Sequence, residues 1–425
     1  MIVLSGATLV LPDRILSPGT LVIEDGRISE IRSDTPSGAH TSFAFHGHYI
    51  VPGFIDIHVH GVDGVDALDT VDDGGAIAAI AARLPRYGVT AFCPTTVACG
   101  PQALRGVLDQ VRRAREKSAA RSARVLPAHL ESNFINPEYG GAQPASCLRS
   151  PRAAFGAGGA GRAGGSGVDD RSGFTAAEIL AEIERATPDV GIVTMASELD
   201  GGLDLVRWLA GRGHRVSLGH SGSTYEEALA AIEAGARHAT HLFNRMPPLG
   251  HRAPGLAGAV LQADEVAAEI ICDGAHVHPA LIRTAIAAKR TSRIFAITDA
   301  TAAAGLPPGS RARLGGLTIT AGEHTALLPD GTIAGSVVTM DRVFQTLVGP
   351  VGLSLVDAAT VCATTPAREL GLIGHGLLAP EAVADLVILD ANFEVVQTYI
   401  AGQLVYARGQ RTEGTEGTES QRGTE

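Results

Sequence analysis

Lysine is almost absent from this chain of 425 residues. Only Lys117 and Lys289 occur, so 32 of the 34 basic residues are arginines. Acidic residues number 45, and the formal net charge is −11. A general nucleic-acid binder needs a basic face for its phosphate contacts, so this balance argues against that class. Any anionic ligand must be held by local positive charge.

Cysteine is also scarce, and long apolar runs are missing. The five cysteines are widely spaced and form no Cys-x-x-Cys pair, which disfavours a disulfide framework or a zinc–thiolate site. They are Cys93, Cys99, Cys147, Cys272 and Cys362. No stretch approaches the roughly 18 apolar residues of a membrane helix, and the residues from Met1 to Gly6 lack the basic start of a secretory signal. We therefore expect a soluble cytoplasmic protein.

The length suits one large α/β barrel with an appendage, because such barrels alone have about 250 residues. Apolar strand-like runs alternate with alanine-rich helical patterns such as 224–234 and 279–289. The runs are 54–57, 89–92, 125–130, 192–195, 216–218, 268–271 and 294–297. Buried runs spaced by helices indicate a parallel sheet. This many units predict an α/β fold of the (β/α)8 TIM-barrel type over residues 52–377.

Both ends of the chain show strand–turn–strand patterns. Residues 21–23 and 27–31 flank an Asp-Gly turn, and residues 384–390, 395–400 and 401–406 repeat the pattern. We predict a small β-sandwich domain formed from residues 1–51 and 378–407. The Gly-rich segment 154–167 is predicted to be a mobile insertion, and residues 408–425, which have almost nothing apolar, are predicted to be a disordered tail.

Metal-capable side chains follow several predicted barrel strands. Alternate residues of a strand share a face, so a His-x-His pair can reach one cation. The six candidates are His58, His60, Glu131, His220, His241 and Asp299. Each alone has an ordinary alternative, such as a helix N-cap for the aspartate or a buried structural histidine. Barrel active sites form at the carboxyl ends of the strands, so the joint pattern predicts a metal site.

Seven motifs follow one another along the chain. They are Pro52-Gly53-Phe54-Ile55-Asp56-Ile57-His58-Val59-His60-Gly61, His129-Leu130-Glu131, Gly219-His220-Ser221, Thr240-His241-Leu242-Phe243-Asn244, Arg252-x-Pro254-Gly255, Asp273-Gly274-x-His276 and Thr298-Asp299-Ala300. This order resembles the amidohydrolase superfamily. Within it, residues 1 to about 406 resemble the family of N-acetylglucosamine-6-phosphate deacetylases, which hydrolyse the acetamide of an amino-sugar phosphate.

The resemblance implies a divalent metal centre. Glu131, His220 and His241 would hold one ion. His58 and His60 would allow a second, with Glu131 bridging the two. Imidazole and carboxylate ligands suit zinc, which we favour, and also iron, manganese or cobalt.

The resemblance also assigns proton transfer to Asp299, which would take a proton from water and return it to the leaving amine. Many other superfamily members bridge their metals with a carboxylated lysine. Lys117 and Lys289 lie in predicted helical segments rather than on barrel strands. Glu131 therefore remains the bridging candidate.

The substrate side of the site combines matches with departures. Asn244, Arg252 and His276 resemble the family's sugar-phosphate contacts, with Arg252 reaching across the interface of a homodimer. Gln143 stands where the family usually has histidine, and Arg245 where alanine is common. We count both among the substrate-binding candidates.

Further departures lie close by in the sequence. Ser132-Asn133 replace the usual Gly-Pro, and Ser197 replaces a proline. We expect the loop that carries Asn133, Gln143, Cys147 and Arg149 to form a reshaped pocket wall. Two alternatives stay open: a divergent amidohydrolase that acts on another N-acylated or cyclic amide, and a non-catalytic sugar-phosphate sensor.

Overall fold

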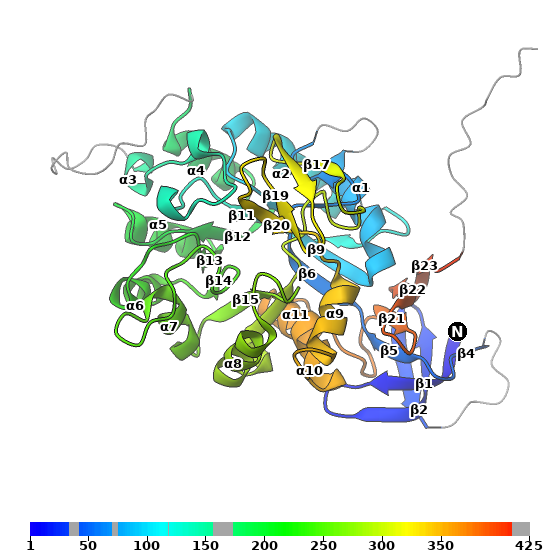
Figure 1. Cartoon of the computed structure of the whole chain (residues 1–425). Helices are drawn as coiled ribbons and strands as arrows, with labels where there is room; N and C mark the ends of the chain where they lie inside the picture. The colour runs from blue at the N-terminus through cyan, green and yellow to red at the C-terminus, as the bar shows by residue number, and fades with distance from the viewer. Residues whose placement is uncertain (34–41, 70–74, 118, 156–172, 410–425) are drawn as a thin grey trace, which may run out of the picture.

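The computed structural model describes residues 1–33, 42–69, 75–117, 119–155 and 173–409, and its centre is a barrel of parallel strands (Figure 1). The barrel strands are β6 (Phe54–Val59), β9 (Val89–Thr96), β11 (Ala128–Glu131), β12 (Val190–Met195), β13 (Arg215–Leu218), β14 (His238–Ala239), β15 (Ala267–Ile271) and β16 (Ile294–Ile297). They pair in this order from β6 to β16. A parallel bridge between Val59 and Ala300 brings the first strand beside the end of the last. The predicted TIM barrel is confirmed.

The third barrel strand differs from its prediction. The run 125–130 is interrupted at Leu126-Pro127, so β10 (Arg124–Val125) and β11 pair with different parts of β9. Proline has no N–H to donate to a neighbouring strand, which explains a break at this point.

Helices cover the outside of the barrel (Figure 1). They are α1 (Ala76–Arg83), α2 (Pro101–Glu116), α3 (Pro151–Ala154), α4 (Ala176–Arg185), α5 (Gly202–Gly211), α6 (Tyr225–Ala234), α7 (Gly255–Gln262), α8 (Pro279–Lys289), α9 (Met340–Val348), α10 (Leu355–Ala359) and α11 (Thr365–Glu369). Thr224 and Glu227 form a capping box at the start of α6, which satisfies backbone N–H groups that the helix itself leaves free. The predicted helices at 224–234 and 279–289 correspond to α6 and α8.

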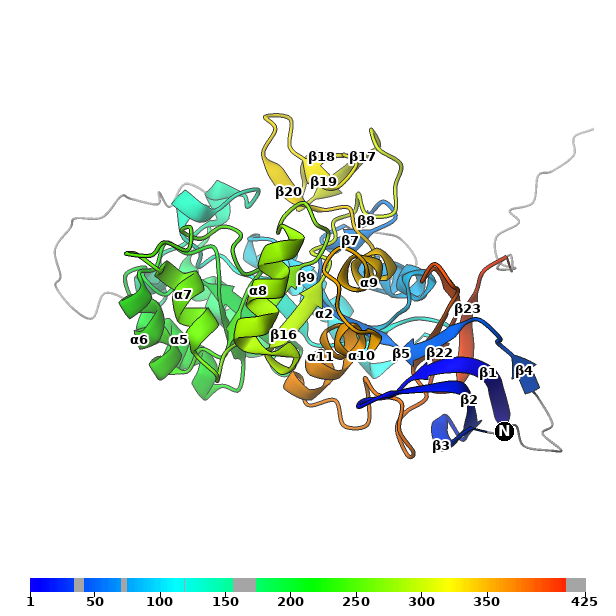
Figure 2. The same cartoon turned by 60° about the horizontal axis from the view of Figure 1, so that its bottom comes forward.

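The two chain ends form the predicted small β domain beside the barrel (Figures 1 and 2). Its strands are β1 (Ile2–Val10), β2 (Ile15–Glu24), β3 (Arg27–Arg32), β4 (Ser42–Ala44), β5 (Tyr49–Pro52), β21 (Leu386–Leu389), β22 (Val395–Ile400) and β23 (Gln403–Ala407). They form one mixed sheet in the order β23-β22-β21-β5-β1-β2-β3, with β4 beside β1. Asp25 (φ 49°) and Gly26 (φ 77°) make the predicted turn between β2 and β3.

A four-stranded antiparallel sheet, which was not predicted, follows the last barrel strand. It contains β17 (Arg311–Leu314), β18 (Leu317–Ala321), β19 (Thr325–Leu327) and β20 (Ile333–Ser336). Figure 2 shows this sheet at one end of the barrel. A short hairpin, β7 (Gly61–Val62) with β8 (Val65–Asp66), follows the first barrel strand.

Two predicted segments fall mostly outside the described residues. Of the Gly-rich segment only residues 154–155 are described, and of the tail only 408–409. Among the helices of the described part, none combines the length and the apolar character that a membrane span requires.

Asp385 joins the small β domain to the barrel. Its carboxylate accepts hydrogen bonds from Arg124 on β10 (2.9 Å), His375 Nδ1 (2.9 Å) and the backbone N–H of Ala401 (2.7 Å). Burial alone would raise the pKa of Asp385, but His375 and Arg124 hold it below its ordinary value of 3.8. The ionised form is therefore the one that ties the two domains together.

Asp385→Ala is expected to lower the free energy of unfolding by about 2–3 kcal/mol, because it leaves partly buried cationic and N–H donors unpaired. The folded pKa is depressed, so the contribution is fully present above the ordinary value of 3.8 and is lost as pH falls through the lower folded value. Denaturant unfolding between about pH 3 and pH 7 measures this. Asp13→Asn, at an exposed carboxylate, is the control. Equal stability of the Asp385 variant and the parent at pH 7 would contradict the expectation.

Candidate metal centre and active site

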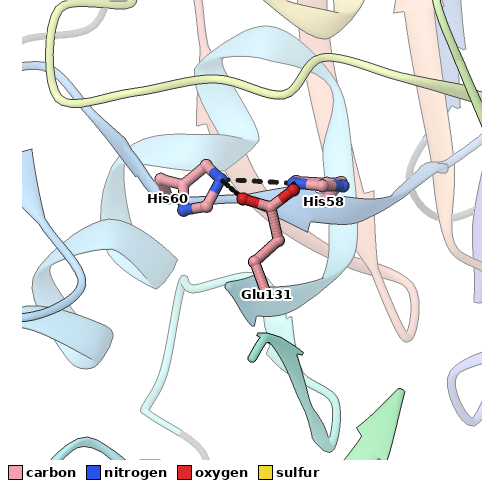
Figure 3. Close-up of side chains that lie close together, drawn as sticks. All are labelled: His58, His60 and Glu131. Atoms are coloured by element: carbon pink, nitrogen blue, oxygen red, sulfur yellow. Dashed lines mark hydrogen bonds and ion pairs between the residues drawn. The ribbon is translucent and has the colours of Figure 1, made fainter. Parts of the chain in front are cut away.

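Five predicted ligands converge at the carboxyl ends of the barrel strands. Glu131 Oε1 lies 2.9 Å from Nε2 of His220 and 3.0 Å from Nε2 of His241. It is also 3.6 Å from Nε2 of His58, while Oε2 is 3.4 Å from Nε2 of His60. Figure 3 shows Glu131 reaching from β11 to the two imidazoles of β6. All five residues are buried.

The donor set fits a cation. Nε2 of His58 and Nε2 of His60 are 3.2 Å apart, and Nε2 of His220 and Nε2 of His241 are 3.0 Å apart. Nδ1 of His220 donates to the carbonyl of Tyr139 at 2.8 Å, which leaves its Nε2 lone pair facing Glu131. Several imidazole lone pairs directed at one buried carboxylate are the arrangement that a divalent ion requires.

The pKa values of the two β6 histidines move in opposite directions. Burial lowers the pKa of His58 to about 4, so this ring is neutral and ready to act as a ligand. Burial opposes the charge of His60 too, but hydrogen bonds to Asp299 and Glu131 raise its pKa to about 10. The pKa of Glu131 lies well below its ordinary value although burial opposes this, because His220, His241 and His60 stabilise its charge. In this site, the negative charge of the carboxylates is therefore offset by positive charge close to them.

Asp299 follows β16 and faces the same centre. Its Oδ1 lies 3.3 Å from Nε2 of both His58 and His60. Burial would raise the pKa of Asp299, but the two imidazoles lower it below its ordinary value, so the carboxylate is ionised near neutral pH. No helix begins at this residue, which removes the N-cap alternative. An ionised carboxylate beside a metal-type donor set can act as a proton acceptor.

Strained backbone is concentrated at these strand exits. His220 (φ 48°), His241 (φ 30°) and Asp299 (φ 51°) all lie in the left-handed region that disfavours side chains. Glu198 supports the loop after His220: it accepts hydrogen bonds from Ser221 Oγ (2.7 Å) and from the backbone N–H of Gly222 (2.6 Å). The fold thus holds three site residues in conformations that cost energy.

A pocket of about 530 Å³ opens onto the centre. Of the predicted substrate-binding residues, four line it: Gln143, Asn244, Arg245 and His276. The strands β17 to β20 contribute Leu314, Ile333, Ala334 and Gly335. Arg252 is exposed and lies outside the lining of this pocket within the single chain.

Gln143 has a different environment from the one expected of a substrate contact. Its Nε2 donates to Glu131 Oε2 at 2.5 Å, and its Oε1 accepts from the backbone N–H of Ala98 at 2.7 Å. Both ends of the amide are thus bonded within the protein. In this arrangement Gln143 holds the second oxygen of the central carboxylate.

The predicted pocket wall from Asn133 to Arg149 is correct only in part. Asn133 Nδ2 donates to the carbonyls of Cys99 (2.8 Å) and Cys147 (2.7 Å). Arg149 stacks on Phe174 and donates to the carbonyl of Leu148. None of Asn133, Cys147 and Arg149 lines the pocket. The side chains of Asn133 and Arg149 therefore satisfy backbone carbonyls of the loop.

The two lysines lie away from the barrel strands. Lys117 caps the C-terminal end of α2, and Lys289 ends α8, where its Nζ donates to the carbonyl of Ala263. Neither is among the residues that line the pocket. Glu131 therefore has no competitor for the bridging position among the lysines of this chain.

Two buried acids of the site were missed by the sequence reasoning. Asp56 on β6 accepts from Thr298 Oγ1 at 2.5 Å, and burial raises its pKa to about 7. Glu269 on β15 lies 2.9 Å from His58 Nδ1, and burial raises its pKa to about 7. The available signal was a single carboxylate with apolar residues on both sides in each strand, because such a group is costly to bury without a partner.

Comparisons with known proteins agree with this geometry. The Amidohydrolase family model matches residues 49–405. The N-acetylglucosamine-6-phosphate deacetylase of Bacillus subtilis is 31% identical and covers 94% of this chain and 95% of its own length. The enzyme of that name from Rattus norvegicus is 35% identical and covers 95% and 94%.

A solved structure of a mutant N-acetyl-D-glucosamine-6-phosphate deacetylase from Mycobacterium smegmatis, in complex with N-acetyl-D-glucosamine-6-phosphate, has 31% identity and a TM-score of 0.82. The match covers 95% of this chain and 99% of that one. The family model spans the barrel and the strands β5, β21 and β22 of the small β domain, and the strand exits carry the ligands that the sequence pattern indicated. This chain therefore belongs to the amidohydrolase family.

Proposed function

We propose that the protein hydrolyses the acetamide of an N-acetyl amino-sugar phosphate, converting N-acetylglucosamine 6-phosphate to glucosamine 6-phosphate and acetate. The observation that carries the proposal is the joint placement of Glu131, the four imidazoles and Asp299 beside a pocket lined by Asn244, Arg245 and His276. Full-length relatives that bear the deacetylase name support the same reaction.

We propose that Glu131, His220 and His241 hold one divalent ion and that His58 and His60 hold a second, with Glu131 between them. Zinc is the favoured ion, and iron, manganese and cobalt suit the same ligands. The metal supplies Lewis acidity, which polarises a carbonyl and makes water a stronger nucleophile at neutral pH.

Asp299 performs the proton transfers in this proposal. Its ionised Oδ1 faces the ligand cluster and the pocket, so it is positioned to accept a proton from the attacking water. The leaving amine must be protonated before the C–N bond breaks, and the acid form of Asp299 returns that proton. Gln143 keeps Glu131 oriented through its 2.5 Å hydrogen bond.

The anionic end of the substrate needs cationic and N–H donors. Arg245 and Asn244 supply these from the loop after β14, and His276 is oriented by Asp273, whose Oδ2 is 2.6 Å from its Nδ1. We propose that Arg252, which is exposed in the single chain, completes a partner subunit's pocket in a homodimer.

Acetate release tests the reaction directly. Protein loaded with zinc, manganese or iron is expected to release acetate from N-acetylglucosamine 6-phosphate far faster than from unphosphorylated N-acetylglucosamine. The 6-phosphate of N-acetylgalactosamine belongs in the panel, because a relative named for that substrate is 31% identical. Absence of release with every metal would overturn the proposal. Activity confined to non-sugar amides would identify a divergent amidohydrolase, and tight binding without turnover would identify a sensor.

Arg245→Ala is expected to raise KM for the phosphorylated substrate by about 10- to 100-fold, because a charge-assisted hydrogen bond contributes roughly 1.5–3 kcal/mol. KM for the unphosphorylated sugar is expected to change less than twofold. Steady-state kinetics with both sugars measure the split. Arg207→Ala, on the outer helix α5, is the control. An equal rise in KM for the two sugars would show that Arg245 does not bind the phosphate.

Arg252 is tested by mixing subunits. Arg252→Ala and Asp299→Asn chains are each expected to be nearly inactive as homodimers. In a mixed dimer, one site combines Asp299 of one chain with Arg252 of the other, so refolding the two together should recover activity. A mixture without recovered activity would show that Arg252 does not act across an interface.

A further inference from the structure

We propose that Glu269 is a positioning residue for the second metal ion: it holds His58 so that the ring presents Nε2 to the ion. Glu269 lies on β15, which β16 separates from β6 in the closed barrel, and both side chains have no exposed surface. Glu269 Oε2 is 2.9 Å from His58 Nδ1. The inference rests on the proposed two-ion site and is independent of the identity of the substrate.

The hydrogen bond determines which nitrogen of His58 carries the proton. A carboxylate accepts, so Nδ1 carries the hydrogen and Nε2 keeps its lone pair. That lone pair faces the centre, where His58 Nε2 is 3.2 Å from His60 Nε2 and 3.6 Å from Glu131 Oε1. A histidine held in this way by a carboxylate is the arrangement that orients metal-binding imidazoles and makes them stronger donors.

His129 does not explain why Glu269 is buried here. His129 Nδ1 donates to the carbonyl of Ile57 at 3.0 Å, and its Nε2 is paired with Thr194 Oγ1 at 2.7 Å. The nearest approach of His129 Nδ1 to Glu269 Oε1 is 3.6 Å. Both ring nitrogens of His129 are therefore used elsewhere, and the cluster of His58, His129 and Glu269 is not a third metal site.

Glu269 Oε1 has no hydrogen-bond partner among the described residues. A fully buried carboxylate with one unpaired oxygen is strongly destabilising unless positive charge offsets it. Its hydrogen-bond donors are the His58 ring and, at 3.4 Å, the backbone N–H of His241. Both belong to proposed metal ligands, so an ion bound through them would supply the compensating charge.

The test is a zinc titration of chelator-stripped protein against a chromophoric competitor, which resolves two binding steps. His58→Asn identifies the step that depends on the β6 pair. Glu269→Ala is expected to weaken that step by about 10- to 100-fold and to change the other step by less than about threefold. Glu269→Gln keeps an acceptor for Nδ1–H, so it is expected to recover most of the lost affinity.

Glu182→Ala is the matched control, since it removes a buried glutamate on α4 that pairs with Arg105 and Arg185 away from the site. It is expected to lower the unfolding temperature without changing either zinc step. A parent that binds zinc in one step, or a Glu269→Ala variant that keeps both steps or weakens both equally, would overturn the inference. If Glu269→Ala fails to fold, an unchanged His58-dependent step in Glu269→Asp, whose side chain is one methylene shorter, would overturn it. Failure of the deacetylase assay alone leaves the zinc result intact, so the two proposals are tested separately.

Discussion

Asp299→Asn is expected to reduce kcat by about 10²- to 10⁴-fold, the usual contribution of a positioned acid–base group. Asparagine keeps the size of the side chain but cannot accept the proton of the attacking water. It also cannot return that proton to the leaving amine. The five proposed ligands are unchanged, so zinc content is expected to stay near that of the parent. Acetate release together with zinc analysis of the same sample measures both quantities.

The control for this prediction is Asp264→Asn, which makes the same change at an exposed site between α7 and β15. It is expected to keep parental activity. Two outcomes would contradict the assigned role. A kcat within tenfold of the parent would show that Asp299 is not the proton carrier. Loss of zinc together with activity would show that Asp299 acts chiefly as a ligand, which its 3.3 Å approach to two imidazoles permits.

Glu131→Ala is expected to remove both ions and all measurable turnover. The Glu131 carboxylate lies within 3.6 Å of Nε2 of each of the four imidazoles, so this single change affects both halves of the site. Zinc affinity should fall by more than the roughly 10- to 100-fold that loss of an outer-shell partner causes. Without the central carboxylate, the Nε2 atoms of the four buried imidazoles would face one another.

Thermal unfolding with and without zinc provides a second measurement. An ion at about 100 times its Kd stabilises the folded parent by about 2.7 kcal/mol, and Glu131→Ala should lose this stabilisation. Glu138→Ala is the matched control, because Glu138 lines the same pocket but is not in a ligand cluster. Parental zinc content in the Glu131 variant would contradict the bridging role.

Much of the fold was accessible from the sequence because its signals are local. The alternation of apolar runs and helical patterns depends on neighbouring residues, so seven of the eight barrel strands and α6 were predicted near their observed positions, whereas β14, with only two residues, was not. The Asp25-Gly26 turn is equally local, since few residue pairs tolerate two consecutive positive φ angles. The sheet from β17 to β20 was not predicted because its strands are short and contain exposed, polar residues, although the Gly315-Gly316 turn between β17 and β18 is a local hairpin signal.

The candidate site shows the same division. His58, His60, Glu131, His220, His241 and Asp299 each lie at the carboxyl end of a strand or just after it, and the carboxyl ends of parallel strands meet at one end of a barrel. The sequence alone therefore predicted that these side chains lie close together, although it could not provide the distances between them. The partners of Gln143 were not, because its bonds to Ala98 and Glu131 depend on the path of a loop.

The sequence by itself determined the class of chemistry: metal-capable side chains at successive strand ends, in the order typical of the amidohydrolases, with no lysine on a barrel strand. The tertiary structure alone decided which groups support that chemistry. Closure of the barrel brings β15 beside the ring of His58 and makes Glu269 its acceptor, although the two residues are 211 positions apart. Exposure of Arg252 was likewise decided by packing. Such contacts depend on closure and side-chain geometry, which local residue patterns do not encode.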